Sequence, residues 1–487
     1  MPNTTIHQAQ PPLEFISPQF TPWVLRFGRT ILPTWLPWKQ NISHVELDNG
    51  KALVEMFQKF QAGKARFLLA FRHPSTNDPP CVAQTVWNEI PKAARQHGIK
   101  LQAQPHVHFV YDRGIPLWAG EKVGWLISHL GGTPIRRGRL DTQGLRSIRE
   151  LFASGEFPIA AAPEGGVNGH NEIVSPLEPG IAQFGFWCVD DLQKNKTKNQ
   201  GTQSSEDVFI VPLGIQYRFH TAPWQKLEQL LTQLETDSGI NLPEALKVPD
   251  LKDGDQLTAD QETILYRRLH SLGEHLLNLM EEFYKTYYQQ PLEVPANDDN
   301  KEANDKLNSG ADWGEKHALA PRLHALLNAA LTVAEQSFGM KPKGSLTDRC
   351  RRLEQASWDR IYRDDLQDLE SLPAVKRGLA DLVAEDANLR IWHMHLVENF
   401  VSVTGKYVAD SPTVERFADT LLLLWKMITQ IKGESKELPN LGRKYAVVTA
   451  GEPICVGDRW PEYKKSRRKA VADLTDTLQH SMEKLIL

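Results

Sequence analysis

The sequence predicts an α/β protein in which a mixed sheet flanked by helices is interrupted by a large, mostly α-helical insertion. Two observations favour this fold class. Short apolar runs alternate with segments of helical spacing over residues 52–213. From 224 to 432 the periodic segments are all helical and are interrupted by a linker at 290–316, before a further apolar and β-branched run at 446–456. Strands that alternate with helices are typical of an α/β fold, and a helical series within such a chain is typical of an insertion.

The elements of the first half follow from hydrophobic periodicity and from turn residues. Apolar residues three and four apart indicate helices, and short apolar runs bounded by polar or glycine-containing segments indicate buried strands. The expected order is helix 52–62, strand 66–72, helix 81–96, strand 107–110, a loop and helix over 115–130, strand 133–135, helix 142–154, strand 157–161, helix 179–190 and strand 208–213.

The second half reads as helices separated by one linker and closed by a final strand and helix. Proline and charge within 290–316 are typical of an exposed linker. A basic cluster opens the last helix, at about 464–485, and clusters of this kind most often form a solvated helix face. The expected helices before it are 224–236, 256–289, 317–337, 345–384, 387–405 and 411–432.

Composition indicates a soluble globular protein of more than one domain. The chain has 487 residues and 55.1 kDa, with 41% hydrophobic and 24% charged residues. Its net charge of −4 provides no overall field for nucleic acid, so no nucleic-acid partner is expected. The four cysteines are scattered and form no Cys-x-x-Cys pair, so neither a disulfide framework nor a metal site is predicted. We therefore expect a reducing, cytoplasmic location.

The N-terminal segment, residues 1–44, has two interpretations. No signal peptide is expected, and no apolar run reaches the ~18 residues that span a bilayer. Residues 15–40, however, mix tryptophan and aliphatic residues with arginine and lysine, which is typical of an element in the headgroup region of a membrane. The alternative is an amphipathic helix packed on the protein's own core. In either case Pro33 and Pro37 are expected to prevent one long helix.

A histidine and an aspartate five positions apart follow the predicted strand 66–72. Of the 16 histidines, only His73 has an aspartate, Asp78, at this offset. Imidazole can take a proton near neutral pH, and a carboxylate beside it can fix its tautomer, so the pair is a candidate general base and its orienting partner. Two simpler interpretations remain open at this point. Asp78 precedes Pro79 and can be a helix N-cap, and His73 can be an ordinary strand-end histidine.

Three further blocks follow in a definite order. They are Gly131–Gly138, which contains a pair of arginines, Ala162–Gly166, which reads Ala-Pro-Glu-Gly-Gly, and the Val-Pro pair within Ile210–Leu213. With the His-x4-Asp block before them, these sequences resemble the blocks of the glycerolipid acyltransferase family of the lysophosphatidate acyltransferase type. The resemblance covers about half of the chain.

The resemblance implies a glycerol-3-phosphate acyltransferase-like fold and O-acyltransferase activity in phospholipid biosynthesis. An acyl group would pass from acyl-CoA or acyl-carrier protein to the hydroxyl of a lysophospholipid, with 1-acyl-sn-glycerol-3-phosphate as the leading acceptor. No cofactor or metal beyond the acyl donor is implied, and the enzyme would associate peripherally with a membrane. The implied roles are His73 as the base, Asp78 as its partner, Arg137 as the phosphate contact, and Pro163, Glu164, Gly165 and Gly166 as the walls of the acceptor site.

The third block departs from the family pattern. Val167 stands where the family usually carries a second phosphate-binding arginine, and His170 nearby has no implied role. This departure leaves open an acceptor without phosphate. The chain could also be a catalytically inactive, acyltransferase-like interaction protein, or a thioester hydrolase that uses the same base on water.

The family's Gly-Glu-Pro-Ile strand, which usually follows the Val-Pro block closely, occurs here only at 451–454. We therefore expect one acyltransferase domain in two parts, residues 45–221 and 441–487. The helical insertion would occupy residues 222–440.

Overall fold

The computed structural model describes residues 8–136, 140–198, 206–248, 251–292, 319–366, 371–401, 403, 406–434 and 436–486. The chain separates into two compact units, which are described one at a time. The first, called here the α/β unit, contains residues 13–221 and 442–487. The second, called the helical unit, contains residues 222–441 together with the described residues 8–12.

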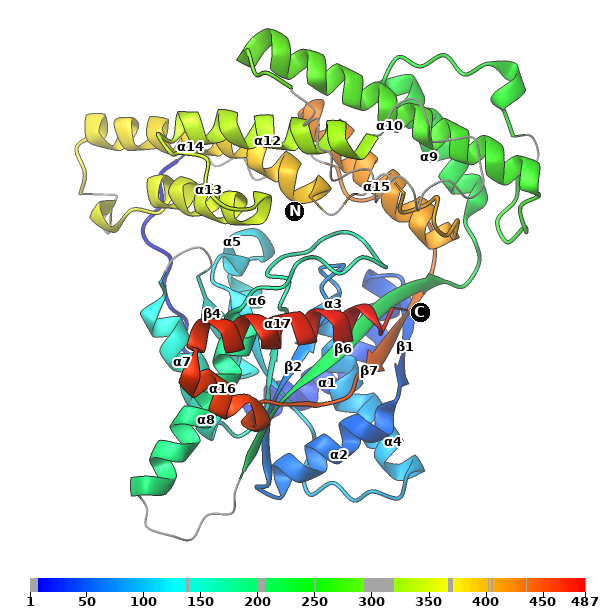
Figure 1. The fold of residues 1–487 in the computed structure, drawn as a ribbon. Coiled ribbons are helices and arrows are strands. Elements are labelled where there is room, and N and C mark those ends of the chain that lie inside the picture. The colour runs from blue at the N-terminus through cyan, green and yellow to red at the C-terminus, as the bar shows by residue number, and fades with distance from the viewer. Residues whose placement is uncertain are drawn as a thin grey trace. The chain divides into compact units, whose positions relative to one another are not determined.

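The described strands of the α/β unit form an eight-stranded mixed sheet (Figure 1). The β6–β7 and β6–β8 pairs are antiparallel, and the other pairs are parallel. The order across the sheet is β1 (Ile42–Asp48), β7 (Lys444–Ala450), β6 (Asp207–Phe219), β2 (Ala65–Phe71), β5 (Ile159–Ala161), β3 (His108–Asp112) and β4 (Thr133–Ile135), and β8 (Ile454–Cys455) pairs with β6.

Helices cover both faces of this sheet because β2 alternates its side chains between two apolar clusters. Phe67, Leu69 and Phe71 enter one cluster, and Leu68 and Ala70 enter the other. The first cluster includes residues of α1 (Pro22–Lys39), α2 (Gly50–Gln61), α3 (Asp78–Gln84), the π-helical turn η1 (Thr85–Glu89) and α4 (Ile90–Gln96). The second includes residues of α7 (Thr142–Ser154), α8 (Gly180–Lys198), α16 (Trp460–Lys465) and α17 (Arg467–Glu483), the last of which is drawn in red in Figure 1.

Three short elements complete the α/β unit. The helices α5 (Ile115–Ala119) and α6 (Glu121–His129) follow β3, and the 3-10 turn η4 (Gly457–Arg459) precedes α16.

The described part of the helical unit contains helices and two 3-10 turns. Two of its helices begin with a capping box, formed by Thr258 with Gln261 and by Ser345 with Asp348. The elements are α9 (Trp224–Asp237), η2 (Glu244–Leu246), α10 (Ala259–Tyr288), α12 (Leu319–Ser337), α13 (Leu346–Ile361), η3 (Asp364–Leu366), α14 (Ala374–Phe400) and α15 (Val414–Ile431).

The predicted class, a mixed sheet flanked by helices, is confirmed, and four local expectations change. One helix expected over 345–384 is two helices, because the chain is extended at Tyr362 and α14 begins after Pro373. The break expected near residue 385 does not occur, since α14 has no helix-breaking residue there. Helix 81–96 contains the π-helical turn η1. Strand β1, which was not predicted, spans the expected boundary between residues 44 and 45. Most of the expected linker 290–316 lies outside the described residues.

The expectation that prolines interrupt the segment 15–40 is wrong. Helix α1 continues through Pro33 and Pro37. A proline cannot donate a hydrogen bond to the carbonyl four residues earlier. The carbonyls affected are those of Arg29 and Pro33, which both belong to exposed residues, so water can satisfy them. Among the described residues, no helix combines the length and apolar character needed to cross a membrane.

Candidate functional site

The candidate site lies at the carboxyl ends of three neighbouring strands. His73 follows β2, Glu164 follows β5, and Tyr217 lies near the end of β6. Because β2 pairs in parallel with both β5 and β6, these three ends meet at one edge of the sheet. Side chains that leave the carboxyl ends of parallel strands commonly form the ligand site of an α/β protein.

The structure brings His73 and Asp78 together. His73 Nδ1 lies 2.9 Å from Asp78 Oδ2, and the His73 side chain is 19% exposed while that of Asp78 is fully buried. The same carboxylate oxygen accepts the backbone N–H of Ser75 at 2.8 Å, and Asp78 Oδ1 accepts the Tyr217 hydroxyl at 2.5 Å. With Nδ1–H directed to Asp78, His73 has Nε2 left to accept a proton.

The interpretation of Asp78 as a helix cap does not describe this geometry. Asp78 is the first residue of α3, but its carboxylate accepts hydrogen bonds from His73, Ser75 and Tyr217. A capping carboxylate would instead accept amide protons of the first helical turn. Burial, together with the Asp78 charge, raises the pKa of Tyr217 well above its ordinary value, so its hydroxyl keeps its proton and donates to Asp78.

Glu164 fixes the backbone of His73. Its Oε1 accepts the His73 backbone N–H at 2.8 Å. Its Oε2 accepts the Asn168 side-chain amide at 2.7 Å and the Ser175 backbone N–H at 2.9 Å. The Glu164 carboxylate therefore holds two segments in place, the strand end that carries His73 and the loop 164–175.

Arg72 joins the same two segments from the other side. Its side chain is fully buried, and its Nε lies 3.7 Å from Glu164 Oε1. Its terminal nitrogens donate to the backbone carbonyls of Asn171 at 2.6 Å, of His170 at 3.1 Å and of Ile173. A guanidinium that reaches three carbonyls holds the course of this loop, because its planar donors have fixed directions.

The remaining residues of the third block shape the turn. The Pro163 carbonyl accepts the Glu178 backbone N–H at 2.7 Å. Gly165 has φ +73, and a Cβ atom at this position would lie 2.0 Å from Glu178 Oε1. The positive φ favours glycine there, and any larger residue would also displace the Glu178 carboxylate. Gly166 follows at a half-buried position.

Arg137, the expected phosphate contact, lies outside the described residues. The segment before it is anchored by Asp141, whose carboxylate accepts the Arg136 backbone N–H at 2.9 Å and an Arg113 guanidinium N–H at 2.5 Å. The same carboxylate caps α7 through the backbone N–H of Gly144.

Val167 and His170, which follow the Pro-Glu-Gly block, differ in exposure. Val167 is 40% exposed, whereas His170 is buried. Burial, with a further contribution from the Arg72 charge, lowers the pKa of His170 to about 4. His170 is therefore neutral at physiological pH.

Sequence reasoning missed Arg72, Asn168, Asn171 and Tyr217. Asn171 and Tyr217 exchange two hydrogen bonds, at 2.9 Å and 2.6 Å, which tie the loop to β6. One signal in the sequence could have found Tyr217. Beyond the Val-Pro pair, apolar residues continue at every second position, at Ile215, Tyr217 and Phe219, which predicts that β6 extends to this edge of the sheet.

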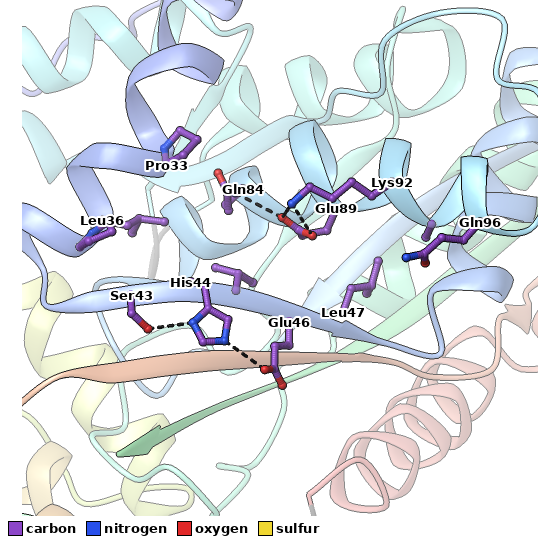
Figure 2. A pocket seen from close by; sticks show the side chains of 13 residues that line it. Pro33, Leu36, Ser43, His44, Glu46, Leu47, Gln84, Glu89, Lys92 and Gln96 are labelled. Atoms are coloured by element: carbon purple, nitrogen blue, oxygen red, sulfur yellow. Dashed lines mark hydrogen bonds and ion pairs between the residues drawn. The ribbon is translucent and has the colours of Figure 1, made fainter. Parts of the chain in front are cut away.

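A cavity of about 530 Å³ lies elsewhere in the α/β unit. Figure 2 shows Ser43, His44 and Glu46 of β1 on one side, with Glu89 and Lys92 on the other. Its polar side chains contact one another, Lys92 with Glu89 at 2.8 Å and His44 with Glu46 at 3.0 Å. Neither His73 nor Asp78 lines it.

Comparison with protein families, with curated proteins and with solved structures finds no match to this chain. Within the described ranges, no three His, Cys, Asp or Glu side chains are grouped so that they could hold a metal ion.

Proposed function

We propose that the α/β unit is an O-acyltransferase of the glycerolipid type, with a glycerol-3-phosphate acyltransferase-like fold. It transfers an acyl group from acyl-CoA or acyl-carrier protein to the hydroxyl of a lysophospholipid, with 1-acyl-sn-glycerol-3-phosphate as the leading acceptor. It acts at the cytoplasmic surface of a membrane. The observation that carries the proposal is the His73–Asp78 pair, a solvent-reaching imidazole on a buried carboxylate held by two further donors.

The proposed reaction uses this pair as follows. His73 Nε2 takes the proton of the acceptor hydroxyl as its oxygen attacks the thioester carbonyl. The tetrahedral intermediate then collapses, the carbon–sulfur bond breaks, and the thiolate takes the proton from the imidazolium. Asp78 stabilises the imidazolium between these steps because it is an anion hydrogen-bonded to the same ring. Arg137 is the proposed contact for the acceptor phosphate.

A transfer assay with radiolabelled acyl-CoA tests this function. The purified protein is incubated with a panel of lysolipids, with and without a phosphate, and both the acylated product and the free thiol are measured. We expect acceptor-dependent product, with thiol release that is faster when acceptor is present. Thiol release at the same rate without any acceptor would contradict transfer and would support the thioester hydrolase instead.

A further inference from the structure

An exposed apolar surface extends along α1 and onto α6. Large apolar side chains at this surface remain open to solvent, although most residues of this type are buried in the α/β unit. We call it the α1–α6 surface, and its members with their exposed fractions are Trp23 (60%), Phe27 (58%), Ile31 (39%), Trp38 (82%), Trp125 (45%) and Leu126 (37%).

The four members on α1 form one stripe. At about 100° per residue, Trp23, Phe27, Ile31 and Trp38 fall within an arc of about 80° around the helix axis. Leu25 and Leu36 lie on the opposite side of the helix and are buried against the core. A second, outward face of the helix is thus mostly apolar, with Thr34 as a polar residue within the arc, and the fold leaves this face uncovered. Exposing large apolar side chains to water is unfavourable, so such a face indicates an interaction surface.

The stripe continues onto α6. The rings of Trp23 and Trp125 lie with their centroids 6.3 Å apart, and Trp125 stacks on His129 at 4.1 Å. The backbone N–H of Thr21, just before α1, donates to the carbonyl of His129 at 2.9 Å. The two helices therefore present one continuous patch.

The two helices that carry the patch are positively charged overall. Helix α1 carries Arg26, Arg29 and Lys39 and no acidic residue, and α6 carries Lys122 and Glu121. Arg26 falls about 60° from Trp23 around the helix, whereas the exposed Arg29 and Lys39 fall towards the side of Leu25 and Leu36. Four cations against one anion give these helices a charge of +3, in a chain whose net charge is −4. A helix that combines exposed tryptophan with arginine and lysine and has no acidic residue is typical of elements that lie in the headgroup region of a bilayer.

We propose that the α1–α6 surface docks the α/β unit on an anionic lipid bilayer, with α1 parallel to the membrane plane. Trp23 and Trp38 lie about 22 Å apart along the helix axis, so both ends of α1 carry an interfacial anchor. Helix α1 packs against α3, whose first residue is Asp78, so one helix layer of about 10 Å separates α3 from the docked lipid. The inference rests on the proposed function only for the idea that the acceptor is a lipid.

Vesicle flotation of the full chain tests the docking without any turnover. Wild-type protein should float with vesicles of phosphatidylcholine and phosphatidylglycerol and should bind less to phosphatidylcholine alone. The triple variant Trp23→Ala, Phe27→Ala, Trp38→Ala should bind at least about tenfold more weakly. The matched control Leu379→Ala, Leu382→Ala removes side chains of similar exposure from α14 in the helical unit and should float like wild type.

Four outcomes separate the possibilities. Equal flotation of the folded triple variant and wild type would overturn the docking surface. If wild-type protein does not float but changes from a dimer to a monomer in the triple variant, the surface binds a second copy of the chain and the proposal also fails. If the triple variant no longer floats but still transfers acyl groups to a water-soluble lysolipid, docking and function are both supported. If the wild-type protein floats but transfers to no acceptor, docking is supported and only the proposed function is contradicted.

Discussion

Each unit contains a histidine that is hydrogen-bonded to a more deeply placed side chain. In the α/β unit, His73 Nδ1 lies 2.9 Å from Asp78. In the helical unit, His393 Nδ1 lies 2.7 Å from the hydroxyl of Tyr284. The hydrogen bonds are similar in length, but the partner of His73 is a carboxylate and the partner of His393 is a neutral phenol.

The two histidines also differ in access. The His73 side chain is 19% exposed, whereas His393 is 2% exposed. Burial, with a further contribution from Arg390, lowers the pKa of His393 to about 4, so this ring stays neutral at physiological pH. A histidine hydrogen bond therefore indicates a general base only when an anionic partner and a route to solvent accompany it.

Changing the hydrogen-bond partner of each histidine should produce the largest difference in transfer rate between two variants. Asp78→Asn removes the negative charge that stabilises the imidazolium, and its single carbonyl oxygen cannot replace both carboxylate oxygens as acceptors for His73, Ser75 and Tyr217. We expect transfer to fall by about 10²–10⁴-fold. Tyr284→Phe should leave the transfer rate within about twofold of wild type, because it acts on the helical unit.

Steady-state kinetics on folded protein, checked by circular dichroism, decide this comparison. Equal loss of activity in Asp78→Asn and Tyr284→Phe would show that both act through general destabilisation.

A second comparison concerns one fully buried arginine from each unit, Arg72 and Arg268. Arg268 bridges α9 and α10, since it donates to Glu235 at 2.7 Å and to Glu228 at 2.8 Å. Arg72 instead holds loop carbonyls and lies near Glu164. Arg72→Met and Arg268→Met should each lower the free energy of unfolding by about 3–5 kcal/mol, because a buried carboxylate loses its cation.

Denaturant titration measures both losses, with the folded fraction assayed for transfer. Only Arg72→Met should reduce the activity of that folded fraction, since only Arg72 positions the loop beside His73. Wild-type activity in folded Arg72→Met would reject this positioning role.

Acid should destabilise both units through buried histidines. The pKa values of His106, His170 and His393 are each lowered to about 4 by burial. Below the unfolded value of 6.5 the unfolded chain binds protons that the folded chain does not, so stability falls as the pH drops from 6.5 towards 4. Each histidine contributes a loss on the order of 3 kcal/mol by pH 4.

Denaturant titrations across this pH range measure how the free energy of unfolding of each unit changes with pH. His106→Asn should reduce this pH dependence for the α/β unit and leave that of the helical unit unchanged. An identical pH dependence in the wild type and the variant would contradict the linkage assigned to His106.

The smallest effect is expected from Tyr217→Phe. It removes one of three donors to the buried Asp78 carboxylate but leaves His73 and Ser75 in place. We expect kcat to fall about tenfold, equivalent to about 1.4 kcal/mol, with KM little changed. A rise in KM at constant kcat would instead place Tyr217 in substrate binding.

The sequence predicted those parts of the fold and site that depend on local pattern. The apolar runs around Phe67 and Ile159 are buried strands, and His73 follows the first of them. The pairing of His73 with Asp78 was also predictable, because five residues of chain keep the two within reach.

Features that depend on tertiary contacts were not predictable. Tyr217 donates to Asp78 across 139 positions of the chain, and Arg72 reaches carbonyls about 100 positions away. Strand β1 was missed because polar residues separate its two buried residues, Ile42 and Val45, so it lacks the continuous apolar run of β2. Helix α1 tolerates two prolines because the affected carbonyls belong to exposed residues, which local propensity does not show.

The central claim is that His73 deprotonates the acceptor hydroxyl, and the transfer rate of His73→Ala tests it most directly. His97→Ala, which removes an exposed histidine after α4, is the matched control. We predict that His73→Ala keeps the wild-type melting temperature and loses about 10²–10⁴-fold in transfer rate, while His97→Ala keeps both. A folded His73→Ala protein that transfers acyl groups at the wild-type rate would contradict the account.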